Sequence, residues 1–220
     1  MSFTNVFPRL ILYFKKHGIK ATISRFGLSF SRLFSKNKSV IFYIDLPLFN
    51  PSSTILPEHA DISRVNRFSS IEKTDIEKIA AITVPETSKK NMMERFDAGA
   101  CLWLLKLNGM LAAYGWTLLG KTFEPYFFPL GSNDVHLFDF YVFPEFRGKR
   151  YNHVLLSHLM AELCLEKRSK AFIDTYEWNA SQLHSLARTP FINLGVARKI
   201  NLFNSLIVLW NKQHSHDYNK

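Results

Sequence analysis

Cysteine is scarce in this sequence, and so are the long apolar runs that mark membrane proteins. Cys101 and Cys164 are the two cysteines among 220 residues, and each falls in an apolar run, where a small buried side chain is expected. This excludes a disulfide framework and favours a reducing compartment. No uncharged apolar run approaches the ~18 residues of a membrane span, and Arg9, Lys15 and Lys16 interrupt any signal-peptide core. We therefore expect a cytoplasmic protein.

Acidic residues are missing from the first 38 positions, which carry eight lysines and arginines. This segment therefore holds +8 of the formal charge of +10, and the rest of the chain is nearly neutral. Apolar residues recur every three or four positions from Ile19 to Leu33, which is the spacing of one helix face. A basic amphipathic helix pair over 1–38 can lie on an anionic membrane surface. Packing on the main domain or on a second subunit is the alternative, and nucleic acid is the least favoured partner.

Beyond this extension the chain is long enough for one substantial core, and strand and helix patterns alternate along it. The two-residue signal Asn108-Gly109 predicts a tight hairpin, and Thr74 is a candidate N-cap. Proline and serine after Asn50 indicate a linker, so we divide the chain into an extension with the first strand at 1–50 and a main domain at 51–220. The expected strands are 40–46, 62–68, 101–107, 110–119, 135–143, 171–176, 196–202 and 205–210, and the expected helices are 74–83, 89–96, 151–168 and a short one after Asn179.

The segment from Asp139 to Asn152 combines a strand end, a basic glycine-containing turn and a helix start. A helix start presents unpaired backbone N–H groups and the positive end of the helix dipole, which together suit a phosphate. Arg147, Lys149 and Arg150 add side-chain charge to the same turn. The layout therefore predicts a site for an anionic cofactor.

This element order and the motif V-x-P-x-x-R-G-K at 142–149 resemble the GCN5-related N-acetyltransferase (GNAT) superfamily over about residues 58–210. The run 96–103 with its hairpin is similar to the family's helix, second strand and turn, and Trp178-Asn179-Ala180-Ser181 is similar to its N-x-x-[AS] segment. The resemblance implies an α/β (α+β) fold, with a mixed, mostly antiparallel central sheet flanked by helices. It also implies an enzyme that moves an acyl group from acetyl-CoA, or another acyl-CoA, to an amine and needs no metal.

The resemblance further implies which residues bind the cofactor. Strand backbone near Val142 would hydrogen-bond the pantetheine arm of CoA, and backbone amides from Gly148 to Asn152 would hold its pyrophosphate. The full set is Phe140, Val142, Arg147, Gly148, Lys149, Arg150, Tyr151, Asn152 and Asn179. Where family members carry R-G-x-G-x-[GA], Arg150 and Asn152 replace the last two small residues. Leu186 stands where many members have the tyrosine that protonates the leaving thiolate.

Acyl transfer from a thioester needs a neutral amine, a donor to the carbonyl oxygen and a proton source for the thiolate. Asp139 and His136 are the candidates for accepting the amine proton. Because they lie three positions apart, we expect them to face opposite sides of a regular strand. A structural hydrogen bond to a neighbouring loop is the alternative role for Asp139, and a solvated strand start is the alternative for His136. His184, Ser185 and Tyr176 are candidates for protonating the thiolate.

We therefore expect a GNAT-type N-acetyltransferase that acts on a small-molecule amine. An amino sugar of envelope polysaccharide synthesis is the favoured acceptor, because the basic extension would bring the enzyme to precursors at the inner face of the membrane. The alternatives are an acetyltransferase acting on RNA, such as a charged tRNA, or on protein, and a non-catalytic membrane-associated protein with the same fold. His214 and His216 are expected to be solvated tail residues rather than metal ligands. The oligomeric state stays open.

Overall fold

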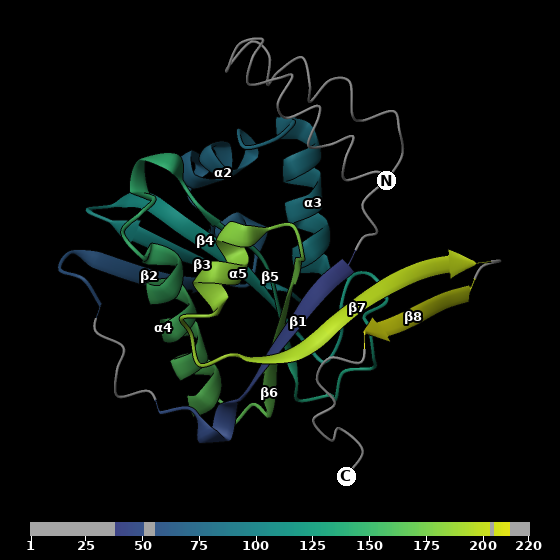
Figure 1. Cartoon of the computed structure of the whole chain (residues 1–220). Coiled ribbons are helices and arrows are strands. Elements are labelled where there is room, and N and C mark those ends of the chain that lie inside the picture. The colour runs from purple at the N-terminus through teal and green to yellow at the C-terminus, as the bar shows by residue number, and fades with distance from the viewer. Residues whose placement is uncertain (1–37, 51–55, 203–204, 212–220) are drawn as a thin grey trace, which may run out of the picture.

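The computed structural model describes residues 38–50, 56–202 and 205–211, which form one mixed sheet with helices on both faces (Figure 1). The expected amphipathic extension lies outside these residues except for Lys38, as do most of the expected linker and both His214 and His216. In the described part of the chain, no helix is long and apolar enough to cross a membrane.

Most strands and helices begin and end within a few residues of the predicted positions. The strands are β1 (Lys38–Asp45), β2 (Ala60–Val65), β3 (Cys101–Leu107), β4 (Met110–Leu119), β5 (Val135–Val142), β6 (Lys170–Tyr176), β7 (Ile192–Leu202) and β8 (Ser205–Asn211). The helices are α2 (Lys73–Ala80), α3 (Pro85–Asp97), α4 (Tyr151–Leu165) and α5 (Ala180–Leu186), with short 3-10 turns η2 (Leu46–Leu48), η4 (Phe68–Ser70) and η5 (Pro144–Phe146). The Asn108-Gly109 hairpin joins β3 to β4 at the predicted bounds.

The predicted N-cap of α2 is wrong. Glu72 precedes the first helical residue, Lys73, in an extended conformation, and its side chain makes no capping hydrogen bond. Thr74 therefore lies inside the first turn of the helix. Because Ile71 is buried in the core and Glu72 is extended, the helix begins directly after them.

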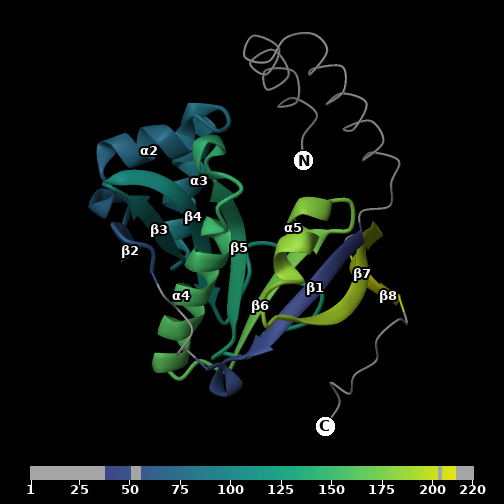
Figure 2. The same ribbon diagram turned by 60° about the vertical axis from the view of Figure 1, so that its left-hand side comes forward.

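The sheet has the strand order β2-β3-β4-β5-β6-β1-β7-β8, and every neighbouring pair is antiparallel except β5 with β6. This confirms the predicted mixed, mostly antiparallel sheet. The parallel pairing covers only Val135–Leu137 with Ala171–Ile173. The carboxyl-terminal parts of β5 and β6 therefore diverge (Figure 2). That divergence sets the position of the candidate site.

Strand β1 lies inside the sheet, between β6 and β7. It pairs antiparallel with β6 over seven residue pairs and with β7 over six. Its alternate side chains enter different core clusters, because Val40 and Phe42 face the α4 side while Ile41 faces the other. Both faces of β1 are therefore buried within the sheet. The division of the chain at residue 50 stays a prediction, and its first segment supplies this strand.

The sheet separates two layers of helices. Leu155, Leu156 and Leu159 of α4 are fully buried against one face, together with Leu105 and Leu137. Helices α2 and α3 cover the other face through a cluster that contains Ile79, Met92, Phe96, Leu104 and Trp116. Helix α5 lies on the α4 side, where Leu186 is fully buried.

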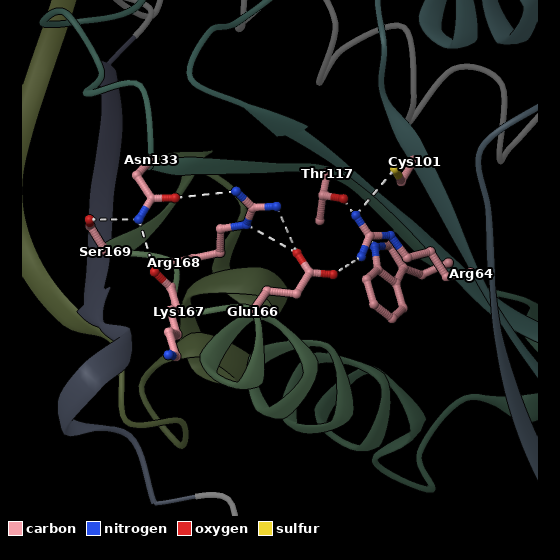
Figure 3. Close-up of polar contacts among 9 residues, drawn as sticks. Arg64, Cys101, Thr117, Asn133, Glu166, Lys167, Arg168 and Ser169 are labelled. Atoms are coloured by element: carbon pink, nitrogen blue, oxygen red, sulfur yellow. Dashed lines mark hydrogen bonds and ion pairs between the residues drawn. The ribbon is translucent and has the colours of Figure 1, made fainter.

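A chain of polar contacts ties α4 to the far edge of the sheet (Figure 3). Arg64 on β2 pairs with Glu166, directly after α4, and its guanidinium carbon lies 5.1 Å from the centre of the Trp103 ring. Glu166 also accepts from Arg168 at 3.0 Å, and Arg168 donates to Oδ1 of Asn133 at 3.2 Å. These contacts join β2, the end of α4 and the loop before β5 at the surface, and they supplement the buried leucines that hold α4 on the sheet.

Candidate active site

Strand β5 carries a β-bulge at Asp139 and Phe140, two of the predicted site residues. Tyr114 pairs with Tyr141 and Trp116 with Phe138, so Asp139 and Phe140 together oppose the single residue Gly115. Asp139 has a left-handed backbone, with a φ of 51°. A Cβ on Gly115 would collide with the ring of Phe140, so glycine is required there for the ring to lie across β4.

The bulge changes which side Asp139 faces. Its carboxylate pairs with Arg95 of α3, and the Arg95 guanidinium carbon lies 5.4 Å from the centre of the Phe138 ring. The His136 ring stacks on the same Phe138 ring, with centres 5.3 Å apart and planes at 11°. His136 and Asp139 therefore lie on the same face of the sheet. The prediction of opposite faces is wrong, because it assumed a regular strand.

Asp139 already has a permanent cation as its partner. The side chain of Arg95 is 24% exposed and lies over the rings of both Trp116 and Phe138, so its guanidinium is held in place. The carboxylate oxygen nearest α3 is therefore engaged in an ion pair within the fold. This geometry agrees with a structural role for Asp139, although its partner is a helix and not a loop.

His136 has a different environment, in a polar pair at the end of the β5–β6 ladder. Its Nε2 lies 3.4 Å from Oδ1 of Asp174 on β6, and both side chains are largely buried. Its Nδ1 is buried and has no hydrogen-bond partner among the described residues. The Tyr126 ring packs edge-on against the imidazole at 5.0 Å. Burial, and then the Asp174 carboxylate, raise the pKa of Tyr126, so its hydroxyl keeps its proton.

Asp174 was missed by the sequence analysis. It falls in the expected strand 171–176, and the spacing of residues within that strand does not show that it pairs with His136. The neighbouring residues offered a signal, because Phe172 and Ile173 make the strand apolar. An unpaired carboxylate is costly to bury in an apolar strand, so Asp174 could be expected to have a polar partner.

A cavity of about 420 Å³ lies where β5 and β6 diverge, between the end of β5, the basic turn and α5. Eight of the nine residues expected to bind the cofactor line it: Phe140, Val142, Arg147, Gly148, Arg150, Tyr151, Asn152 and Asn179. Lys149 does not line the cavity. Ser181, Gln182 and Ser185 of α5 complete the wall, so the structure brings the turn and the Asn179 segment together.

The turn before α4 has two residues with a positive φ, as a glycine-rich loop would have, but only one of them is a glycine. Gly148 has a φ of 80°, and Arg150, the residue before the helix, has a left-handed φ of 61°. A left-handed conformation costs a residue with a side chain about 1 kcal/mol. Arg150 thus keeps the backbone that a glycine would adopt there, and it adds a guanidinium to the cavity wall.

Other side chains of the site are held by local hydrogen bonds. Arg147 donates from Nε to the carbonyl of Val142 at 3.1 Å, which directs it back along β5. Asn179 caps α5, because its Oδ1 accepts from the Gln182 N–H at 3.3 Å. Asn152 donates to Oγ of Ser185 at 3.2 Å and so links the start of α4 to α5.

The three candidates for protonating a thiolate lie in different places. Ser185 lines the cavity of about 420 Å³, whereas His184 lines a second cavity, of about 460 Å³, that adjoins it. Tyr176 ends β6 and stacks on Trp178, with ring centres 5.2 Å apart. Burial, and then the carboxylates of Asp174 and Glu124, raise the pKa of Tyr176.

Comparison with known proteins identifies the family. The model of the acetyltransferase (GNAT) family matches residues 70–188, which is more than half of the chain. The chain therefore belongs to the GNAT acetyltransferases, enzymes that transfer acyl groups. No curated protein matches the sequence.

Solved structures of low sequence identity share the fold. A GNAT-family acetyltransferase from Colwellia psychrerythraea is 13% identical, with a TM-score of 0.52, over 80% of this chain and 56% of that one. A tandem GNAT protein from the clavulanic acid biosynthesis pathway is 15% identical, with a TM-score of 0.53, over 72% of this chain and 51% of that one. A glucosamine N-acetyltransferase region of a fungal multi-domain beta-N-acetylglucosaminidase is 14% identical, with a TM-score of 0.54, over 79% of this chain and 22% of that one. This chain matches about half or less of the length of these proteins.

Proposed function

We propose that this protein is a CoA-dependent N-acyltransferase that moves an acyl group, acetyl foremost, to the amine of a small molecule. The observation that carries the proposal is the separation of β5 from β6 after three residue pairs, with a cavity of about 420 Å³ where they part. The basic turn and the start of α5 both line this cavity, so a long anionic cofactor would have polar partners along its length.

CoA would bind with its pyrophosphate at the turn. The backbone amides of Tyr151 and Asn152, at the start of α4, have no carbonyl partner within the helix and would donate to the phosphate oxygens. The Arg150 guanidinium would add a charge-assisted contact. The pantetheine arm would then run past Val142 and Phe140, toward the point where β5 and β6 meet.

We propose His136 as the group that accepts the proton of the attacking amine. Its Nε2 would donate to Asp174, which leaves the lone pair of Nδ1 to take the proton. Because Nδ1 is buried, the amine would have to displace the Tyr126 ring that packs against the imidazole. Asp174 would orient the imidazole and stabilise the imidazolium that forms, as in other acid–base pairs. Both residues flank the last β5–β6 residue pair, Leu137 with Ile173, at the closed end of the gap, where the thioester would lie.

The leaving thiolate also needs a proton source. Among the candidates, Tyr176 is the one that we favour, because it ends β6 two residues beyond Asp174, where β6 has separated from β5. Ser185 lines the cavity beside the basic turn, and His184 lines the adjoining cavity, so both are candidates closer to the phosphate end.

For the acceptor we propose an amino sugar, in envelope polysaccharide synthesis at the inner face of the membrane. The support is the basic composition of residues 1–38, which favours an anionic surface. The fungal glucosamine N-acetyltransferase region has the same fold, but at 14% identity it supports the fold alone.

Calorimetric titration with acetyl-CoA tests the cofactor, and release of free thiol with a panel of amines tests the reaction. The panel holds glucosamine, nucleotide-linked amino sugars, polyamines, peptides and charged tRNA. We expect binding in the micromolar to millimolar range and the fastest turnover with an amino sugar. No binding at millimolar acetyl-CoA would reject the proposal. Binding without turnover on any amine would favour a non-catalytic protein with the same fold.

A further inference from the structure

The cavity of about 460 Å³ beside the basic turn shares Arg150 with the first cavity and adds Arg188. Its eight lining residues include two arginines and two histidines, Arg150, Arg188, His153 and His184, and among the described residues no carboxylate lines it. Gly148, Arg150, Asn152, Ser181 and Ser185 line both cavities, so the two are continuous around the turn.

The arginines of this second cavity are available to a ligand. Within the described part of the chain, the side chains of Arg150 and Arg188 make no salt bridge or hydrogen bond, and both residues are exposed. Arg147, by contrast, donates to the carbonyl of Val142. Arg188 is held by its backbone at the end of α5, where its N–H donates to Ser185 at 3.2 Å. Two guanidiniums without partners on one cavity wall form a place for a dianion.

We infer that this second cavity binds the 3′-phosphate of the CoA nucleotide. The inference rests on the proposed function, because it takes the pyrophosphate at the Gly148–Asn152 turn as its starting point. The ribose 3′-phosphate is the next anionic group along CoA, and the second cavity is the next space beyond the turn. Arg150, which stands where related turns carry a small residue, belongs to both cavities and would contact both phosphate groups.

The consequence is selection of the acyl carrier. A phosphopantetheine arm on a carrier protein has one phosphate and no nucleotide, so it would leave Arg188 without a ligand. The protein should therefore prefer an acyl group on CoA, with the 3′-phosphate as the feature that it recognises.

Calorimetry with CoA and with dephospho-CoA, which lacks only the 3′-phosphate, tests the inference on the full chain. We expect dephospho-CoA to bind about tenfold more weakly than CoA, which is the size of one good charge-assisted contact. Arg188→Gln should weaken CoA by about the same factor and leave dephospho-CoA unchanged. Arg150→Gly should reduce the preference while keeping the turn backbone. Arg67→Gln, which removes one positive charge from an exposed residue outside both cavities, is the control and should leave the ratio unchanged.

The possible failures are distinct. If neither ligand binds, the proposed function fails, and the inference fails with it. If CoA and dephospho-CoA bind equally, or if Arg188→Gln weakens both to the same extent, the function stands and the 3′-phosphate subsite is wrong.

Discussion

The two sides of the β5–β6 gap differ in burial and in charge. On the face that carries α2 and α3, His136 is 9% exposed, stacks on Phe138 and pairs with Asp174. On the face that carries α4 and α5, Arg150 and Arg188 are exposed on the walls of a cavity. A buried polar pair is suited to moving a proton away from water, whereas exposed cations are suited to reversible binding of an anion. Substitutions on the first side should therefore reduce turnover, and substitutions on the second should reduce affinity.

The largest effect should come from His136→Ala. Removing the proposed proton acceptor should lower turnover with the best amine by at least about 100-fold, because general base catalysis contributes that much or more. The affinity for acetyl-CoA should not change, since His136 lies outside the lining of both cavities. Thiol release and calorimetry measure the two quantities. His59→Ala, at an exposed histidine on the other side of β3, is the matched control. An equal loss of affinity and turnover would remove the distinction between the two sides.

Asp174→Asn should have a smaller effect of the same kind. The amide keeps the shape of the side chain and loses the charge that stabilises the imidazolium, so we expect turnover to fall about tenfold at neutral pH. Asp139→Asn provides the comparison, and a greater loss of turnover there than at Asp174 would transfer the catalytic role to the bulge.

Gly115→Ala should reduce both the stability of the fold and the affinity for CoA, because Gly115 contacts a ring of the first cavity. The added methyl group collides with the Phe140 ring, which lines the first cavity, so we expect a stability loss of about 1–3 kcal/mol and CoA binding weaker by about fivefold. Thermal unfolding and calorimetry measure these changes. In the double variant with Phe140→Ala, the stability losses should be smaller than their sum, because the collision is gone. Additive losses would mean that the ring does not transmit the effect.

Arg147→Gln should have the smallest effect, less than about threefold on CoA affinity. Its guanidinium is already engaged by the Val142 carbonyl and lies 5.4 Å from the centre of the Tyr141 ring, so little of its charge is directed at a ligand. Calorimetry beside Arg188→Gln gives the comparison. A larger loss at Arg147 than at Arg188 would reverse the assignment of the two arginines.

Local chemistry explains which features could be predicted from the sequence. Asn108-Gly109 determines a hairpin by itself, and the basic turn between β5 and α4 follows from its own residues, so both were found. The bulge at Asp139 depends on Gly115, a residue of another strand, which allows the Phe140 ring to lie across it. No pattern within β5 contains that information.

The proposed catalytic pair, His136 and Asp174, illustrates the same limit at longer range. His136 and Asp174 are 38 residues apart, and only the short parallel ladder between β5 and β6 brings them to 3.4 Å. The position of β1 in the sheet could not be predicted either. Its apolar run predicts a buried strand but does not indicate that β6 and β7 pair with it. Features that depend on one segment followed from local chemistry. Features that join two segments were predicted only where the family resemblance implied them, as for the sheet and for the Asn179 segment beside the basic turn.

The interior position of β1 has a consequence for synthesis on the ribosome. Its neighbours begin only at Lys170 and Ile192, so well over a hundred residues must be added before β1 can pair on either side. At ~5–20 residues per second, the nascent chain carries this strand unpaired for roughly 6–25 s. The run includes Val40, Ile41 and Phe42, all buried in the finished sheet, and it is an aggregation hazard during that interval. We expect the yield of folded protein to depend on chaperones that shield this strand, and to improve when translation is faster between β1 and β7.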